Sequence, residues 1–153
     1  MRVLILGMGN PMLADDGVGI RVAQEVGTRI PDAKVITSTV VGLNLLDIIA
    51  GFDKAFIIDA ALGTEDGLGK VKVLSEDEGS LHLFSSHGLN FPDILKLGRE
   101  LGHTLPEDVT VYGIEIGALV SFSEELSPEL TGKLQSIADR IARNIEARLQ
   151  GSQ

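Results

Sequence analysis

The sequence predicts a single-domain α/β fold in which a central, mostly parallel, twisted sheet of about five strands carries helices on both faces. Two observations predict it. Short β-branched runs alternate along the chain with segments of helical spacing, and this alternation is typical of parallel sheets whose strands are connected by helices. The length of 153 residues matches one domain, which we expect to span residues 1–150, with a frayed tail at 151–153.

The first third of the chain predicts a strand, a helix and a second strand. Arg2–Leu6 is an apolar run of strand length, and the β-branched run Ala33–Thr37 predicts the second strand. Between them, the segment Ile20–Ile30 has helical spacing, because apolar residues recur at every fourth position and so share one helical face. That face consists of Val18, Val22, Val26 and Ile30.

The middle of the chain continues the alternation. Asn44–Ala50 predicts a short helix that Gly51 ends, and Ala55–Ile58 predicts a third strand. The segment Gly63–Gly69 (GTEDGLG) is rich in turn residues. This link allows the fourth strand, Lys70–Leu74, to run antiparallel to the others.

The last third predicts two helices around a fifth strand. Asn90 is a favourable N-cap for a helix over Phe91–Leu101, whose apolar side contains Ile94 and Leu97 as well as Leu101. Val109–Ile116 predicts the fifth strand.

The final helix has the clearest signals. Ser127 is a favourable cap and Pro128 suits the first turn. Its apolar stripe consists of Leu130, Leu134, Ile137, Ile141 and Ile145.

The composition excludes several classes of function. The chain has no cysteine, which excludes disulfides, thiolate metal sites, iron–sulfur clusters and cysteine nucleophiles. The formal net charge of −9 argues against nucleic acid as a partner, because such binding usually needs a basic face. No apolar run approaches the ~18 residues of a membrane span, and the opening apolar run is too short for a signal peptide. We therefore expect no membrane insertion and a cytoplasmic location.

The segment Gly7–Gly19, which reads GMGNPMLADDGVG, is the most informative part of the chain. It joins the first strand to the first helix and carries two adjacent acids, Asp15 and Asp16. In open α/β sheets, ligands bind beyond the carboxyl ends of the strands, where the strand order reverses. If the order begins 2-1-3, this loop meets Asp59, which follows the third strand, at one crevice.

Each of these acids also has a structural interpretation. Asp59 can form a turn or a cap, and either Asp15 or Asp16 can cap the first helix. Because one helix does not need both acids as caps, we expect Asp15 to cap or turn the chain and Asp16 to face the crevice.

One histidine, His87, stands in a strand-to-helix loop. A loop histidine is often only solvated, and His82 and His103 stand in less organised surroundings. Together with Asp16 and Asp59, His87 offers two carboxylates and an imidazole. This set suits Ni²⁺, Zn²⁺ or Mn²⁺, with positions left open for other ligands.

Several familiar motifs are absent. Gly7 and Gly9 begin a G-x-G-x-x-G motif, but Met12 occupies the third glycine position, and Ser38-Thr39 stands where an acid would follow the second strand. Dinucleotide binding is therefore disfavoured, and we expect no organic cofactor. The chain also has no G-x-x-x-x-G-K-[ST], H-E-x-x-H or G-x-S-x-G segment.

Four segments in order resemble the hydrogenase maturation endopeptidases, the family that trims the C-terminus of the large subunit of nickel–iron hydrogenases. They are GMGNPMLADDGVGIR from Gly7, GLNLLD at 42–47, DKAFIIDA at 53–60 and SSHGL at 85–89. The late segment Leu126–Glu129 resembles the start of the family's final helix. These pieces span nearly the whole chain, and the first is the most specific.

The resemblance implies an α/β peptidase domain of the aspartyl-type endopeptidase class, with metal-site residues corresponding to Asp16, Asp59 and His87. It implies that nickel belongs mainly to the substrate, a large-subunit precursor already loaded with the metal. Two carboxylates and an imidazole would then occupy open coordination positions on nickel held by substrate thiolates. Only a precursor that carries nickel would bind in this way. Whether a metal activates the carbonyl or water, or a carboxylate acts as general base, stays open.

Two segments depart from the family pattern and leave the choice of hydrogenase open. Residues 113–120 lack a proline or paired acids, and residues 38–42 are less rich in glycine. Three other functions compete with the peptidase. A non-catalytic module that binds nickel or the precursor is one. A phosphoacceptor receiver domain is another, but Ile116-Gly117 stands where its lysine would end the last strand. Peptidyl-tRNA hydrolase would need a histidine and an arginine near Asp15–Gly17.

Overall fold

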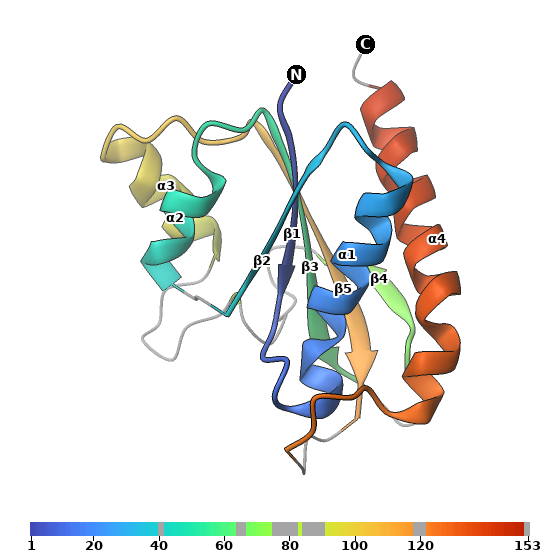
Figure 1. The fold of residues 1–153 in the computed structure, drawn as a ribbon. Helices are drawn as coiled ribbons and strands as arrows, with labels where there is room; N and C mark the ends of the chain where they lie inside the picture. Colours follow the sequence, from blue (N-terminus) through green and yellow to red (C-terminus); the bar gives the residue numbers. More distant parts are fainter. Residues whose placement is uncertain (40–41, 64–66, 75–82, 84–90, 118–121, 152–153) are drawn as a thin grey trace.

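The computed structural model describes residues 1–39, 42–63, 67–74, 83, 91–117 and 122–151. In these ranges the strands form a five-stranded sheet of order β2-β1-β3-β5-β4 (Figure 1). Strands β2, β1, β3 and β5 are parallel, and β4 is antiparallel to β5. The sheet thus has the 2-1-3 start on which the expected crevice depended, and its fourth strand is antiparallel, as the turn-rich link allowed. The strands are β1 (Val3–Met8), β2 (Lys34–Ser38), β3 (Lys54–Leu62), β4 (Val71–Val73) and β5 (Asp108–Ile116).

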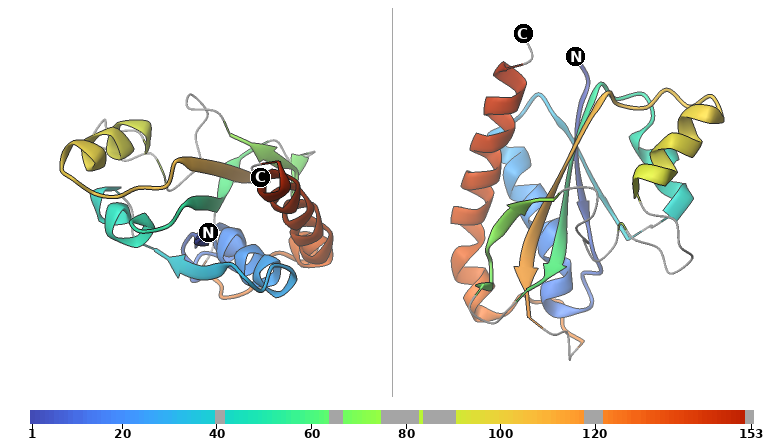
Figure 2. Two further views of the ribbon diagram at one scale, coloured as in Figure 1. Left: turned by 90° about the horizontal axis from the view of Figure 1, so that it is seen from above. Right: turned by 180° about the vertical axis from the view of Figure 1, so that it is seen from behind.

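Helices cover both faces of the sheet, as predicted. Helices α1 and α4 lie on one face and α2 and α3 on the other, so the chain forms three layers (Figures 1 and 2). Within the described ranges, no helix combines the length and the apolar character needed to cross a membrane. The helices are η1 (Ala14–Gly17), α1 (Val18–Arg29), η2 (Gly42–Asn44), α2 (Leu45–Ile49), α3 (Phe91–Glu100) and α4 (Pro128–Gln150), where η marks a short 3₁₀ helix.

The layer of α1 and α4 packs the larger apolar core against the sheet. At the start of α4 the Ser127 hydroxyl accepts the Leu130 N–H at 3.4 Å, and Pro128 occupies the first turn, as predicted. Both predicted apolar faces are buried, which removes their side chains from water and fixes the two helices on the sheet. The buried residues are Val18, Val22, Val26, Ile30, Leu130, Leu134, Ile137, Ile141 and Ile145.

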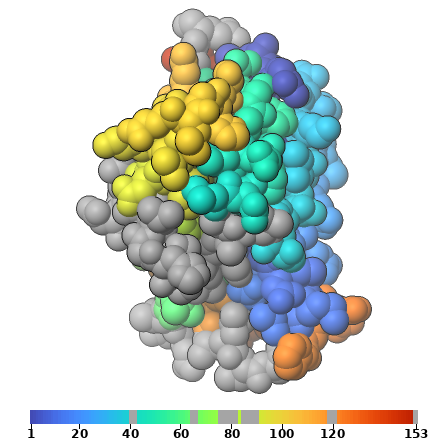
Figure 3. All heavy atoms as spheres, turned by 90° about the vertical axis from the view of Figure 1, so that its left-hand side faces the viewer, coloured from blue at the N-terminus to red at the C-terminus, as the bar shows by residue number. Residues whose placement is uncertain are grey.

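Helices α2 and α3 cover the opposite face of the sheet (Figure 3). A second apolar cluster lies beneath them. Phe91 of α3 and Leu45 of α2 are buried in it. The predicted apolar side of α3 is wrong at one position. The helix ends at Glu100, so Leu101 is not part of its stripe, and 66% of its surface is exposed.

Helix α1 approaches the sheet very closely at Gly19. A Cβ atom at this position would lie 2.5 Å from the carbonyl oxygens of both Met8 and Ile58, and 3.0 Å from the Cα of Asp59. Close-packed interiors leave no room for such an atom without a shift of the backbone. Glycine at this position therefore lets the first turn of α1 rest on β1 and β3.

Tyr112 links the sheet to α4 through a buried hydroxyl group. The ring stacks on Phe56 with 6.5 Å between centroids, and the hydroxyl donates to the Asn144 side-chain oxygen at 2.6 Å. Burial raises the pKa of Tyr112 from 10.0 to about 12, although the nearby Arg148 guanidinium acts in the opposite direction.

We expect Gly19→Ala to lower the free energy of unfolding by about 1–3 kcal/mol, because the new methyl group would overlap two backbone oxygens that the sheet holds in place. Gly132→Ala is the matched control, since it lies in α4 and a Cβ there would meet nothing within 4 Å. That change should raise the stability by up to about 1 kcal/mol through helix propensity. Urea denaturation measures both values. A Gly19→Ala variant as stable as the wild type would contradict the close approach.

The single tyrosine and the absence of tryptophan make the titration of Tyr112 directly measurable by ultraviolet absorbance. We expect a midpoint at about 12 in the folded protein and near 10.0 in urea. Because folding raises this pKa, the protonated tyrosine favours the folded state, and its contribution is fully present below pH 10.0. Stability should then fall as the pH rises toward 12. Equal midpoints in the two states would show that the hydroxyl group is not buried.

Candidate active site

The loop after β1 fixes the position of Asp16. Gly9 has a φ of +151°, and a Cβ there would overlap the Asp16 carbonyl oxygen, so the chain can fold back at this point only with glycine. The returning chain forms η1, in which the Asp16 Oδ2 atom accepts the Asn10 backbone N–H at 2.8 Å. Asp16 is only 2% exposed. The glycine-rich loop thus encloses this carboxylate.

Of the two roles expected for Asp15, a cap or a turn, the structure shows the turn, because Asp15 lies in η1. The N-cap of α1 is Gly17, which makes no side-chain capping bond. The Asp15 Oδ1 atom instead accepts the Ser127 backbone N–H at 2.6 Å and so ties the loop to the start of α4. The capping alternative was not borne out, and no local signal indicated the bond to Ser127, because capping signals involve only chain neighbours and Ser127 is 112 residues away.

Asp59 lies inside β3, which corrects the prediction that it follows this strand. We predicted a strand over Ala55–Ile58, but β3 continues to Leu62 because β5 pairs with it along its whole length. Pairing of β3 with β1, on the other side, stops at Ile58. Asp59 therefore stands where β3 no longer has β1 beside it. The residue is fully buried, and its Oδ1 atom accepts the Ala60 N–H at 2.8 Å.

The structure brings Asp16 and Asp59 to the same end of the sheet. The η1 helix, which contains Asp16, packs against β3, and Gly19 rests on the backbone of Asp59. This end lies at the carboxyl ends of the parallel strands, opposite the two chain termini (Figure 1). The strand order reverses between β1 and β3, which is where ligands bind in such sheets. Carboxylates at this position can bind a cation or accept a proton from water.

His87, the third residue of the expected set, lies outside the described residues, as do His82 and the expected cap Asn90. In the ranges that the structure describes, no group of three or more His, Cys, Asp or Glu side chains is placed to hold a metal ion. The meeting of Asp16 and Asp59 with His87 therefore stays a prediction.

A third buried carboxylate, which the sequence analysis did not single out, belongs to Glu115 of β5. It is 6% exposed and pairs in register with Ala61, two positions beyond Asp59 on β3. Because side chains alternate along a strand, Glu115 and Asp59 project from the same face of the sheet. The Glu115 Oε1 atom forms an ion pair with the Lys72 Nζ atom of β4 at 2.7 Å. The sequence feature that could have indicated this buried carboxylate is a single charged residue between two isoleucines at the end of a strand.

Comparison with known proteins gives the family of this chain. A sequence model of the family described as "Hydrogenase maturation protease" matches residues 20–144. The chain belongs to this hydrogenase maturation protease family. It is 27% identical over 160 residues to the hydrogenase 2 maturation protease of Escherichia coli strain K12, and the match covers 99% of this chain and 93% of that protein.

Solved structures show the same fold. The hydrogenase maturating endopeptidase HybD from E. coli matches with a TM-score of 0.72 and 21% identity, covering 97% of this chain and 94% of that one. The [NiFe] hydrogenase maturation protease HybD from Thermococcus kodakarensis matches with a TM-score of 0.62 and 26% identity, covering 95% and 99%. These findings confirm the expected family and fold, and they identify the chain as a peptidase.

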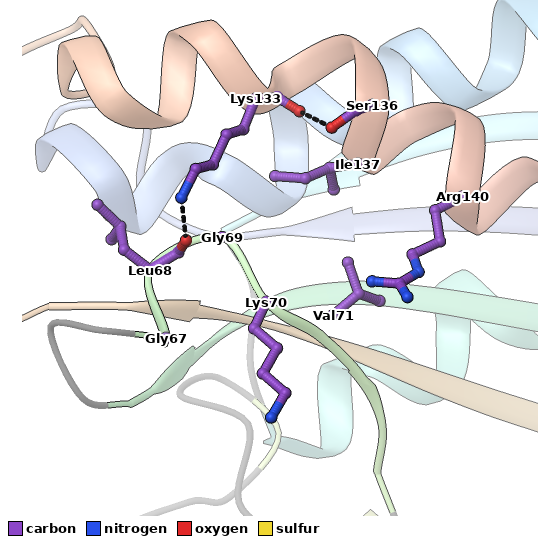
Figure 4. A pocket seen from close by; sticks show the side chains of 9 residues that line it. All are labelled: Gly67, Leu68, Gly69, Lys70, Val71, Lys133, Ser136, Ile137 and Arg140. Carbon is purple, nitrogen blue, oxygen red and sulfur yellow. Dashed lines mark hydrogen bonds between the residues drawn. The ribbon is translucent and has the colours of Figure 1, made fainter.

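Two hollows on the described surface of this protease lie away from its buried carboxylates. One, of about 320 Å³, lies between β4 and α4, where the Lys133 Nζ atom donates to the Leu68 carbonyl oxygen at 2.8 Å. Figure 4 shows Lys70 pointing away from α4, so the cationic groups there do not converge. The other, of about 430 Å³, includes Lys54 and Asp108 at the amino ends of β3 and β5. Neither hollow includes a residue of the expected site.

Proposed function

We propose that this protease removes a C-terminal extension from the nickel-loaded precursor of a nickel–iron hydrogenase large subunit. Relatives named hydrogenase 2 maturation protease and [NiFe] hydrogenase maturation protease support a hydrogenase as the substrate. The nickel is carried by the substrate, and Asp16, Asp59 and His87 bind it. The reaction takes place in the cytoplasm, which agrees with the absence of cysteine.

One observation carries this proposal. The chain buries two carboxylates, Asp16 and Asp59, from separate segments at the ligand-binding end of the sheet. Burial of a charged group is unfavourable unless other groups compensate it. The Asn10 and Ala60 N–H groups offset part of this cost, and a cationic ligand would add to that stabilisation. Nickel bound to thiolates of the substrate would offer a cation with coordination positions that oxygen and imidazole ligands can fill.

The chain positions on either side of His87 support its inclusion. Leu83 precedes it by four residues and Phe91 follows it by four. Both are buried in the apolar cluster that contains Ile57. Because Ile57 and Asp59 are two residues apart on β3, they project from the same face of the sheet. The segment that carries His87 thus begins and ends at residues packed over the face from which Asp59 projects.

Binding of the nickel would fix the scissile peptide beside the carboxylates. Water then attacks the peptide carbonyl carbon, its proton passes to a carboxylate acting as general base, and the carbon–nitrogen bond breaks as the leaving amine takes up a proton. Such a use of carboxylates is that of an aspartyl-type endopeptidase. A precursor without nickel would lack the group that positions it, so metal loading would be tested before cleavage.

We expect Asp16→Asn, Asp59→Asn and His87→Ala each to slow cleavage of the nickel-loaded precursor at least about 100-fold, because each removes a ligand. Asp15→Asn is the matched control, since its side-chain oxygen can still accept the Ser127 N–H and the change lies beside Asp16. It should cleave like the wild type. Mass spectrometry measures the loss of the tail peptide.

Circular dichroism checks that the variants fold, which we expect of Asp16→Asn because its amide oxygen can still accept the Asn10 N–H. Unimpaired cleavage by both Asp16→Asn and His87→Ala would refute the site. A wild-type protein that binds the precursor without changing its mass would instead indicate a binding module for this substrate.

The proposal also predicts that nickel-free precursor stays uncut by the wild type. The reason is that the coordination positions recognised by the three side chains are then missing. The same mass measurement before and after nickel is loaded into the precursor tests it, and cleavage should start only after loading. Efficient cleavage of the nickel-free precursor would show that the metal is not what the protease recognises.

A further inference from the structure

Three large apolar side chains are exposed at the carboxyl ends of the parallel strands. Met12 follows β1, Leu62 ends β3 and Phe122 follows β5, and their exposed fractions are 51%, 66% and 86%. A single exposed leucine or methionine needs no explanation. These three residues, however, lie at or beyond the carboxyl ends of the neighbouring strands β1, β3 and β5, at the end of the sheet that buries Asp16 and Asp59. We call Met12, Leu62 and Phe122 the apolar rim.

The backbone holds two members of the apolar rim together. The Ser123 N–H donates to the Met12 carbonyl at 2.9 Å, and the Ala14 N–H donates to the Ser123 carbonyl at 2.8 Å. These bonds form a parallel bridge between the loop after β1 and the segment before α4. Figure 3 shows the two segments, blue and orange, next to each other at the lower end of the molecule. Met12 and Phe122 are therefore presented on one braced surface.

The loop that carries Met12 is also strained and tied down. Ala14 has a φ of +49°, a left-handed conformation that is unfavourable for a residue with a Cβ atom. The bond from Ala14 to Ser123 holds this conformation, and the bond between Asp15 and the Ser127 N–H braces the same two segments. Strain of this kind persists where surrounding contacts over-determine the backbone, and it is frequent at binding sites. A surface ordered before binding loses less conformational entropy when a partner docks.

We propose that the apolar rim docks the folded body of the hydrogenase precursor beside the cleavage site. This inference rests on the proposed function. Met12 belongs to the loop that holds Asp16, and the bridge from Leu13 to Ser123 places Phe122 beside that loop. A protein whose tail reaches this loop would therefore lie near Met12 and Phe122. Phenylalanine and methionine are enriched at the centres of protein interfaces, where a few buried residues carry most of the binding energy.

The charges beside the apolar rim indicate which kind of precursor surface would bind there. Glu124 and Glu125 follow Phe122 closely and are exposed, and the whole chain carries a net charge of −9. Complementary charge steers protein partners together and disfavours like-charged ones. The matching surface of the precursor is therefore an apolar patch bordered by lysine or arginine, and not a second acidic surface.

The test measures kcat and KM for cleavage of the nickel-loaded precursor by the wild type, Phe122→Ala and Met12→Ala. We expect KM to rise about tenfold in Phe122→Ala and less in Met12→Ala, with kcat unchanged, because docking is weakened without any change in the reacting groups. Leu101→Ala is the matched control, since this leucine is equally apolar and 66% exposed but lies at the end of α3. Both of its constants should stay at the wild-type values.

The outcomes separate this inference from the proposed function. If the wild type cleaves and Phe122→Ala has wild-type KM, or loses kcat instead, the docking role is overturned and the proposed function stands. If the wild type does not cleave, the proposed function fails. Fluorescence anisotropy with labelled precursor then decides the docking role, because equal affinities of the wild type and Phe122→Ala overturn it and an affinity about tenfold weaker in the variant supports it.

Discussion

The contact of Gly19 with the ends of β1 and β3 is the constraint on which the rest of the site depends. Because this residue has no side chain, α1 begins directly on the backbone of Met8, Ile58 and Asp59. The short η1 helix must then lie over the end of β3, and Asp16 comes with it. A larger residue would lift α1 from the sheet and carry Asp16 away from Asp59. The glycine-rich segment Gly7–Gly19 thus forms a turn and, through Gly19, also sets how closely α1 approaches β1 and β3.

The three buried carboxylates at this end of the sheet each have a hydrogen bond or an ion pair with another residue of the chain. Asp16 receives the Asn10 N–H, Asp59 receives the Ala60 N–H, and Glu115 is paired with Lys72. Such contacts offset the loss of hydration that each carboxylate suffers on burial. They also fix the carboxylates before a substrate arrives. If the peptidase recognises the substrate metal as proposed, ligands held in this way need no reorganisation when the substrate binds.

The apolar rim adds a second level of recognition to the same end of the molecule. Carboxylates can test for a cation, but they do not distinguish one metal-bearing protein from another. Rigid apolar side chains supply that distinction, because they bind only where the partner has a patch of matching shape. Asp15 connects the two levels, since it neighbours Asp16 in the loop and braces Ser127 at the start of α4. The structure thereby joins the proposed nickel-binding loop to the segment that presents Phe122.

The sequence by itself determined most of the fold. The helical stripes of α1 and α4 and the Ser127 cap followed from local periodicity and capping chemistry, because these signals arise between chain neighbours. The 2-1-3 start of the strand order was only a condition in that reasoning, and the turn-rich link only allowed β4 to be antiparallel. The sheet itself decided both. Family membership also followed from segments read in order along the chain. Asp16 is buried at the expected end of the sheet, and its place in a ligand crevice stays a prediction. Of the two roles expected for Asp15, the structure has the turn and not the cap.

Only the tertiary structure decided the contacts between residues that lie far apart in the chain. Strand β3 passes through Asp59 because β5 pairs with it, and the Asp15 carboxylate accepts a backbone N–H 112 residues away. The buried Glu115 forms an ion pair with a half-exposed lysine of another strand. Leu101 is exposed because α3 ends before it. Phe122 stands beside the loop of Asp16 through a backbone bridge that no local pattern encodes. Such contacts form only when the sheet assembles, since pairing between strands and burial of charge are properties of the packed chain and not of any one segment.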